Sequence, residues 1–211
     1  MSDKPVLYGF DGSTYVRTVR MVARDKGVDY DQVPLNVLEG EPRQAEHLKR
    51  HPFGKVPVLD IDGIRIRETD AICRYLEATR PEPALVPDDP KARARMNEAI
   101  SVVNAYGYPA LVGVAGYHLF PDFIGGQDAA ALAKAKEGSV TALNLLMGLR
   151  GSDPWIAGAD PSLADYFLGP IIFYLSLTPE MDEMKGVEGL TDWWAGMSAL
   201  PTFKATEPDL G

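Results

Sequence analysis

Two neighbouring hydroxyl groups lie in the turn Asp11-Gly12-Ser13-Thr14, between a short apolar stretch and a stretch with helical spacing. A hydroxyl at a helix start lies beside free backbone N–H groups and the positive end of the helix dipole, which favour negative charge. Ser13 is therefore either an ordinary helix cap or a group that holds an anion such as a thiolate. Thr14 is the alternative candidate for the second role.

Metal and cysteine chemistry are less favoured by the pattern. His47 and His51 are four residues apart, but Pro52 disfavours helix at His51, so the two imidazoles are not expected on one helical face. With no third ligand nearby, we predict no metal site. Cys73 lies beside the apolar face of a predicted helix, which favours core packing over a reactive thiol.

The elements that must position these residues change in character near residue 80. Before it, short β-type and helical stretches alternate in the order βαβαββα, and Asp62-Gly63 between two apolar stretches predicts a hairpin. After it, the spacing is helical almost throughout. One predicted helix runs from Pro90 towards Tyr106, with a kink expected at Pro109.

A proline-rich segment separates the two regions. We predict a first domain over residues 1–80, a linker over 81–90 and an all-helical domain over 91–211. Ser162 and Asp165 form the pattern of a capping box at the start of a helix in the second region, and another helix over 190–200 is expected to stop at Pro201.

Composition restricts the class of protein. The chain has 211 residues, 45% of them apolar and 24% charged, which is typical of a folded globular protein. Residues 1–80 carry 13 basic and 13 acidic side chains, so the net charge of −9 falls on the rest of the chain. The lack of a basic patch argues against nucleic acid as a partner.

The sequence also predicts no membrane partner. The longest weakly polar stretches, 109–120 and 166–177, are shorter than the roughly 20 apolar residues that span a bilayer. Residues 1–5 do not begin a signal peptide, and a single cysteine cannot form an intramolecular disulfide. These features predict a cytoplasmic protein.

Four motifs occur in a fixed order along the chain. They are the Ser13 turn, HPFGKVPVL at 51–59, ETDAI at 68–72 and SLAD at 162–165. In this order and spacing, essentially the whole chain resembles the glutathione S-transferase family. The resemblance implies an α/β thioredoxin-like N-terminal domain that binds glutathione, followed by an all-α C-terminal domain that lines the site of an electrophile.

The resemblance also implies roles for the residues around the hairpin. The Val56–Pro57 bond is expected to be cis, with the Val56 backbone paired to the cysteinyl backbone of glutathione. Glu68 and Thr69 correspond to a Glu-Ser pair that holds the γ-glutamyl end, where a helix start suits the α-carboxylate. Thr69 keeps the hydroxyl of the usual serine. A helix cap with an acidic neighbour is the plain alternative.

Three further positions match the family. Lys55 corresponds to a residue that often contacts the glycyl end, and its alternative role is that of a solvated lysine. Arg43 corresponds to a basic residue that some members place near the glycyl carboxylate. Phe53 corresponds to an aromatic residue that some members insert into a partner subunit, which implies a homodimer; its alternative role is a contact with the core.

Members of the family differ in the residue that faces the sulfur. Tyrosine-type members carry a tyrosine where this chain has Gly9, and Tyr8 should point to the other face of the strand. Ser13 matches the serine-type members. Cysteine-type and isomerase-like members need a cysteine in this turn, and residues 12–16 contain none, which argues against thiol exchange and isomerisation.

The resemblance thus implies an enzyme that conjugates the glutathione thiolate, stabilised by Ser13, to small hydrophobic electrophiles in detoxification. Glutathione is a co-substrate, and no other cofactor is expected. Glutathione-dependent peroxide reduction or dehalogenation would use the same thiolate, and a non-catalytic ligand-binding or protein-interaction module of the same fold is the alternative. Five aromatic groups of the helical region either line the electrophile pocket or pack in the core: Tyr106, Tyr108, Tyr117, His118 and Phe120.

Overall fold

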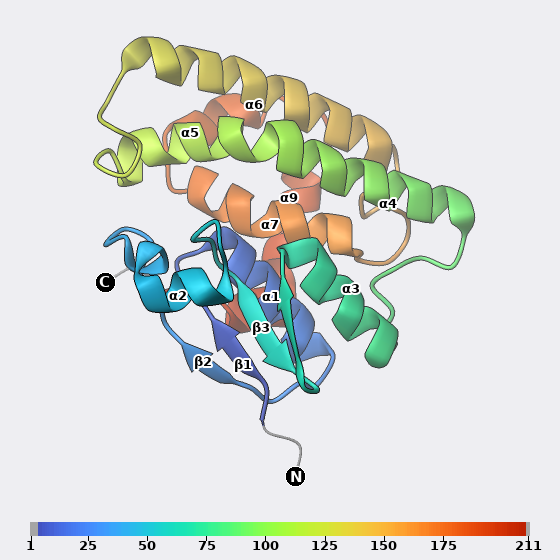
Figure 1. Cartoon of the computed structure of the whole chain (residues 1–211). Coiled ribbons are helices and arrows are strands. Elements are labelled where there is room, and N and C mark those ends of the chain that lie inside the picture. Colours follow the sequence, from blue (N-terminus) through green and yellow to red (C-terminus); the bar gives the residue numbers. More distant parts are fainter. Residues whose placement is uncertain (1–3, 210–211) are drawn as a thin grey trace. The chain divides into compact units, whose positions relative to one another are not determined.

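The structure is a computed structural model that describes residues 4–209 (Figure 1). The residues considered above for a signal peptide therefore lie partly outside the described range. The chain forms two compact units, Met1–Ala84 with Pro201–Gly211, and Leu85–Leu200. The boundary differs from the predicted domains, since the last residues join the first unit and most of the proline-rich segment belongs to it.

The first unit has the predicted βαβαββα order of a thioredoxin-like domain. Its elements are β1 (Val6–Tyr8), α1 (Thr14–Asp25), β2 (Asp31–Val33), the 3-10 helix η1 (Glu41–Arg43), α2 (Ala45–Arg50), β3 (Val58–Ile61), β4 (Ile64–Arg67) and α3 (Thr69–Thr79). The strand order in the sheet is β2-β1-β3-β4. The β1–β2 pair is parallel, and the other two pairs are antiparallel.

The β3–β4 hairpin forms at the predicted turn. Asp62 and Gly63 both have positive φ, 51° and 77°, as a two-residue hairpin turn with the right-handed twist requires. Glycine adopts this conformation without steric cost, and aspartate is one of the few other residues that tolerates it. This turn fixes the pairing of Ile61 with Ile64 and hence the register of both strands.

A buried ion pair explains why the first unit extends to Ala84. The side chain of Lys26, at the end of α1, is fully buried, and its Nζ lies 2.6 Å from Glu77 Oε2 on α3. The same ammonium donates to the carbonyl oxygens of Pro81 and Pro83. The linker segment is therefore anchored to the first unit by one buried cation.

The C-terminal helix α10 (Pro201–Ala205) is part of the first unit because it packs on α1. Arg17 donates to the Phe203 carbonyl at 2.9 Å, and Thr202 donates to the Met21 carbonyl at 3.1 Å. The predicted stop at Pro201 is correct for the preceding helix. The new helix begins at the same residue because proline fits the first position of a helix.

The second unit is all-helical, as predicted. Its elements are α4 (Pro90–Val102), the π-helical turn η2 (Val103–Gly107), α5 (Tyr108–Leu119), α6 (Ala129–Arg150), α7 (Leu163–Leu175), α8 (Glu180–Met184) and α9 (Leu190–Ala199). Every residue of α7 is buried, so this helix forms the core of the unit.

The long helical segment that begins the second unit was predicted to kink at Pro109. In the structure its irregularity lies before Pro109. The π-helical turn separates α4 from α5, and Pro109 falls in the first turn of α5, where a missing N–H is tolerated. Helical structure thus continues over residues 90–119. This corrects the prediction that the longest apolar stretches are too short to span a bilayer. Among residues 4–209 this is the one helix long and apolar enough to cross a bilayer, with a mean hydropathy of 1.3, and half of that window is buried.

The capping box of α7 is a buried hydrogen-bond centre. Asp165 Oδ2 accepts from the backbone N–H and the hydroxyl of Ser162, both at 2.9 Å. Its Oδ1 accepts from Trp193 Nε1 at 2.7 Å and from the Ile156 N–H at 3.1 Å. Burial raises the pKa of Asp165, and these hydrogen bonds to the carboxylate oppose that effect. One carboxyl group therefore ties the start of α7 to α9 and to the preceding loop.

We expect Asp165→Ala to lower the free energy of unfolding by about 3 kcal/mol or more, because it leaves several buried donors without an acceptor. Asp89→Ala is the matched control, because Asp89 also caps a helix but at an exposed position. It should cost about 1 kcal/mol. Urea unfolding measures both values, and equal losses would contradict the role assigned to Asp165.

Candidate functional site

Ser13 is the N-cap of α1. Its backbone is extended (φ −79°, ψ 124°), and its hydroxyl accepts from the Val16 N–H at 3.4 Å. The side chain is half-buried, whereas Thr14 is only 8% exposed. A hydroxyl that accepts one hydrogen bond still has a proton to donate. Helix capping and the stabilisation of an anion are therefore compatible roles for Ser13.

The turn before Ser13 is held by β2 and by α1. Gln32 Nε2 donates to the Gly9 carbonyl at 2.8 Å and to Asp11 Oδ1 at 2.7 Å. Arg20 pairs with the same carboxylate at 3.2 Å. Gln32 was not singled out in the sequence, because nothing in its local pattern indicates that β2 lies beside this turn.

The end of β1 has no room for a side chain. Gly9 has φ +149°, and a Cβ built there would lie 2.4 Å from Val16 Cγ2 and 3.4 Å from Val56 Cβ. The position that holds tyrosine in tyrosine-type members cannot hold one here. Tyr8 is engaged elsewhere, since its hydroxyl donates to Asp60 at 3.3 Å and its ring lies under the Arg50 guanidinium.

The register of the sheet brings the predicted glutathione-binding segments to one end. Tyr8 pairs with Val58, and Val58 pairs with Arg67, so these residues form a row across β1, β3 and β4. Along the chain, the Ser13 turn follows Tyr8, the Val56–Pro57 bond precedes Val58, and Glu68 follows Arg67. Because neighbouring strands lie about 4.8 Å apart, the row spans about 10 Å. The Val56–Pro57 bond is cis, as expected.

Glu68 begins α3 in a strained backbone conformation. Its φ is 69°, a region that non-glycine residues rarely adopt, while its side chain is 75% exposed. Strain of this kind persists where the surrounding structure imposes it, often at binding sites. Thr69 follows in the first turn of the helix and is 8% exposed. The pair therefore presents a carboxylate, a hydroxyl and the free N–H groups of a helix start.

His51 supports Glu68. Its Nε2 lies 3.5 Å from Glu68 Oε1, and its Nδ1 accepts from the Phe53 N–H at 3.3 Å. Burial lowers the pKa of His51, and the charge of Glu68 opposes that effect. The acceptor role of Nδ1 places the proton of the neutral ring on Nε2, from which it is donated towards Glu68.

The second histidine holds the loop before the cis bond. His47 Nε2 lies 2.8 Å from the Lys55 carbonyl oxygen. Lys55 itself is exposed, as is Arg43, whose Cγ would lie 3.4 Å from a Cβ built on Gly54. The structure thus brings Arg43 beside the residue that precedes Lys55.

The sequence pattern offered both histidines as candidate metal ligands and gave no sign of these supporting roles. Over residues 4–209, no three side chains of the usual ligand types are grouped as a metal site. Pro52 was the sequence signal for the position of His51, because a proline there ends α2 before His51 and leaves this histidine in the following loop. Cys73 is fully buried, and burial raises its pKa, so the thiol packs in the core as predicted.

The aromatic residues predicted either to line the electrophile pocket or to pack in the core differ in their contacts. Some pack against neighbouring side chains, and one is exposed to solvent. His118 Nε2 lies 2.7 Å from Glu180 Oε2, and its ring contacts that of Tyr117. Phe120 packs edge-on against Tyr174 of α7. Tyr106, in the π-helical turn, is 68% exposed.

Comparison with known proteins identifies the family. The sequence profile of "Glutathione S-transferase, N-terminal domain" matches residues 7–84. The chain is 33% identical over 201 residues to glutathione S-transferase PM239X14 of Arabidopsis thaliana, a match that covers 90% of this chain and 89% of the relative. The chain belongs to the glutathione S-transferase family.

Two further similar proteins differ in the names they carry, and this chain matches both over most of its length. It is 32% identical over 214 residues to a probable maleylacetoacetate isomerase of Caenorhabditis elegans, covering 99% of this chain and 95% of that one. The structure of maize glutathione S-transferase I in complex with an atrazine glutathione conjugate superimposes with a TM-score of 0.84 at 25% identity, over 97% and 96% of the two chains.

In this transferase, Gly9→Ala should lower the free energy of unfolding by about 2–4 kcal/mol, because the added methyl group combines a clash with backbone strain. Gly27→Ala is the matched control. Gly27 also has positive φ (63°), but a Cβ there would meet nothing within 4 Å. The control should lose about 1 kcal/mol in urea unfolding. An equal loss in both variants would contradict the close approach at Gly9.

Proposed function

We propose that the protein is a glutathione transferase that conjugates the glutathione thiolate to small hydrophobic electrophiles. The observation that carries this proposal is the placement of the Ser13 hydroxyl at the start of α1, beside a strand end that excludes a side chain at Gly9. The atrazine glutathione conjugate in the maize relative supports conjugation as the reaction.

The chemistry depends on the acidity of the thiol. A free thiol has a pKa near 8.5, so only a few per cent is thiolate at neutral pH. Donation from Ser13 and the N-terminus of α1 favour the charged form. A pKa lowered by about two units corresponds to roughly 2.7 kcal/mol of preferential thiolate stabilisation. The thiolate then attacks an electrophilic carbon, a C–S bond forms, and the leaving group departs with the bonding electron pair.

Glutathione would be held along the row at the end of the sheet. The γ-glutamyl carboxylate would accept from Thr69 and the N–H groups at the start of α3, while Glu68 pairs with the ammonium. The Val56 backbone would pair with the cysteinyl backbone. Lys55, with Arg43 nearby, would bind the glycyl carboxylate. The protein's part is binding, orientation and thiolate stabilisation, with glutathione as the co-substrate.

We expect Ser13→Ala to keep its glutathione affinity within a few fold and to lose turnover by about 100-fold or more, as when one donor to a reacting anion is removed. Turnover with an activated aryl chloride such as chlorodinitrobenzene measures the effect, and calorimetry measures glutathione binding. Thr14→Val is the matched control and should retain activity. Loss of turnover in Thr14→Val with full activity in Ser13→Ala would assign the role to Thr14.

Isomerisation is a second candidate function, favoured by the identity to the probable maleylacetoacetate isomerase. The same thiolate would add to a conjugated double bond, allow rotation about the resulting single bond, and leave. The missing cysteine in residues 12–16 argues against it. Assays with maleylacetoacetate and with peroxides separate these activities from conjugation. Glutathione binding without turnover of any electrophile would instead indicate a ligand-binding or protein-interaction module.

We further propose that the protein acts in the cytosol as a two-fold symmetric homodimer. Phe53 is 79% exposed, the highest exposure among the large apolar side chains of the described residues. Its backbone is fixed by the hydrogen bond to His51, so the ring projects from a held loop. A ring presented in this way suits insertion into a second copy.

Phe53→Ser should shift the protein from dimer towards monomer in sedimentation velocity at micromolar concentration, because it removes an apolar anchor from the interface. Phe123→Ser is the matched control, since Phe123 is also exposed, at 54%, but lies in the second unit. The control should remain dimeric. A monomeric wild type, or equal dissociation of both variants, would contradict the assignment.

A further inference from the structure

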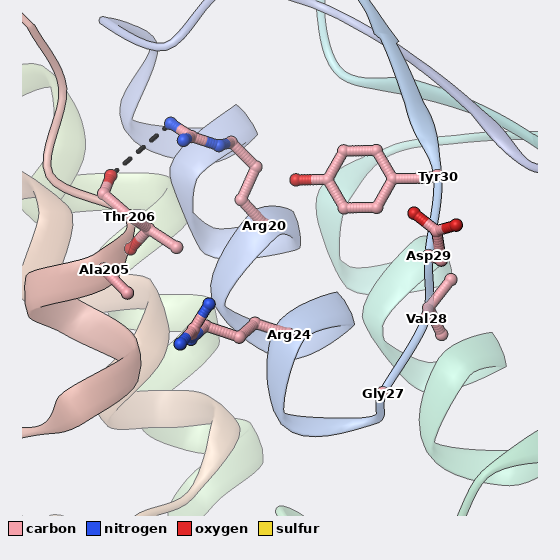
Figure 2. Close-up of a pocket in the computed structure, with 8 residues that line it drawn as sticks. All are labelled: Arg20, Arg24, Gly27, Val28, Asp29, Tyr30, Ala205 and Thr206. Atoms are coloured by element: carbon pink, nitrogen blue, oxygen red, sulfur yellow. Dashed lines mark hydrogen bonds between the residues drawn. The ribbon is translucent and has the colours of Figure 1, made fainter.

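A cavity within the first unit lies outside the residues proposed to bind glutathione, although it shares Arg20 with the support of the Ser13 turn. It is open to solvent and has a volume of about 350 Å³ between the C-terminal half of α1, the segment that leads into β2, and the end of α10 (Figure 2). The side chains that matter for its chemistry are Arg20, Arg24, Val28, Tyr30, Ala205 and Thr206. All of them belong to the same compact unit.

The cavity is distinct from the glutathione site. Arg24 follows Ser13 by eleven residues along the chain, nearly all of them in α1. With a rise of about 1.5 Å per helical residue, the separation along the axis is about 16 Å. A carboxylate bound at Arg24 would therefore lie well away from the sulfur that Ser13 is proposed to hold, although Arg20 of the same cavity contacts Asp11 in the Ser13 turn.

Two guanidinium groups lie on one side of the cavity, one helical turn apart. Arg20 is already engaged, because it pairs with Asp11 at 3.2 Å and donates to the Thr206 carbonyl at 3.4 Å. Arg24 is exposed, and its side chain makes no hydrogen bond or ion pair with another residue of the described range. Because Asp11 already neutralises much of the charge of Arg20, Arg24 is the guanidinium that a bound anion would pair with.

The nearest carboxylate on the lining does not neutralise Arg24. Asp29 is 87% exposed, and its Oδ1 lies 3.2 Å from Lys4 Nζ. In Figure 2, Asp29 stands beside Tyr30, on the opposite side of the cavity from the two arginines. The arginine side of the cavity therefore keeps one cation that no residue between 4 and 209 pairs in a salt bridge.

The remaining walls are suited to a flat apolar body. Tyr30 is half-buried, with its hydroxyl directed towards Arg20 in Figure 2, and Val28 and Ala205 contribute small apolar side chains. Burial raises the pKa of Tyr30, while the charge of Arg20 opposes that effect, so the phenol stays protonated and able to donate. A volume of about 350 Å³ is at the lower end of the range for small-molecule sites and exceeds the needs of a bare inorganic anion.

We propose that this cavity binds a small aromatic carboxylate. The carboxylate accepts from Arg24 in the two-pronged geometry that guanidinium groups favour, with Arg20 contributing charge. The ring lies against Tyr30, Val28 and Ala205. The proposal concerns a second site and is independent of the transferase activity.

Benzoate is the probe, and amide chemical shifts of the full-length protein are the readout. We expect benzoate to shift the signals of residues 27–30 and 205–206 with a dissociation constant of about 1 mM, equivalent to about −4 kcal/mol. Excess glutathione should not displace it. Benzamide, which has the same shape without the charge, should bind at least about tenfold more weakly, as expected for loss of a charge-assisted hydrogen bond.

Arg24→Gln should weaken benzoate binding by about tenfold or more with only a small decrease in the thermal midpoint, because the side chain is exposed and its structural contribution is a favourable charge in the last turn of α1. Lys204→Gln is the matched control. It removes the same charge from α10, at an exposed residue that does not line the cavity, and should leave the affinity unchanged.

Three results would overturn the proposal. One is the absence of benzoate-dependent shifts in residues 27–30 and 205–206. Another is equal binding of benzamide and benzoate by the wild type, a comparison that needs no variant. The third is an equal effect of Arg24→Gln and Lys204→Gln, which would show only a general response to net charge.

Discussion

The close approach of β1 to helix α1 is the constraint on which the rest of the site depends. Gly9 lies so near Val16 and Val56 that no side chain fits at the end of the strand. Under the proposed function, the group that stabilises the thiolate comes from the turn that follows, where Ser13 begins the helix. The same approach seats the loop with the cis bond against the strand end, so one packing contact positions both the hydroxyl proposed to face the sulfur and the backbone proposed to bind glutathione.

Buried or half-buried polar side chains hold the loops around this contact. Gln32 and Arg20 fix the turn before Ser13 through Asp11. His51 contacts the Glu68 carboxylate, and His47 contacts the carbonyl oxygen of Lys55. Each makes its contact from a neighbouring element, so these contacts restrain the loops and reduce the conformational freedom that is lost when a ligand binds.

The local chemistry of the chain allowed most of the fold to be predicted. The Asp62-Gly63 turn, the Ser162 cap and the helical spacing of α1 are encoded within a few residues, and each is present. The contacts that a short window of sequence cannot contain were missed. Examples are the hydrogen bond from Arg17 to Phe203, 186 residues apart, and that from Gln32 to Gly9. The resemblance to a family supplied the candidate site residues, and the register of the sheet explains why they lie together.

The measurement that tests the central claim most directly is an ultraviolet titration of the thiolate of bound glutathione, with Ser13→Ala beside the wild type. Our account predicts a thiol pKa about two units below the free value near 8.5 in the wild type and close to that free value in the variant. Bound glutathione with an unshifted pKa in the wild type, or with the same lowered pKa in both proteins, would contradict the role of Ser13.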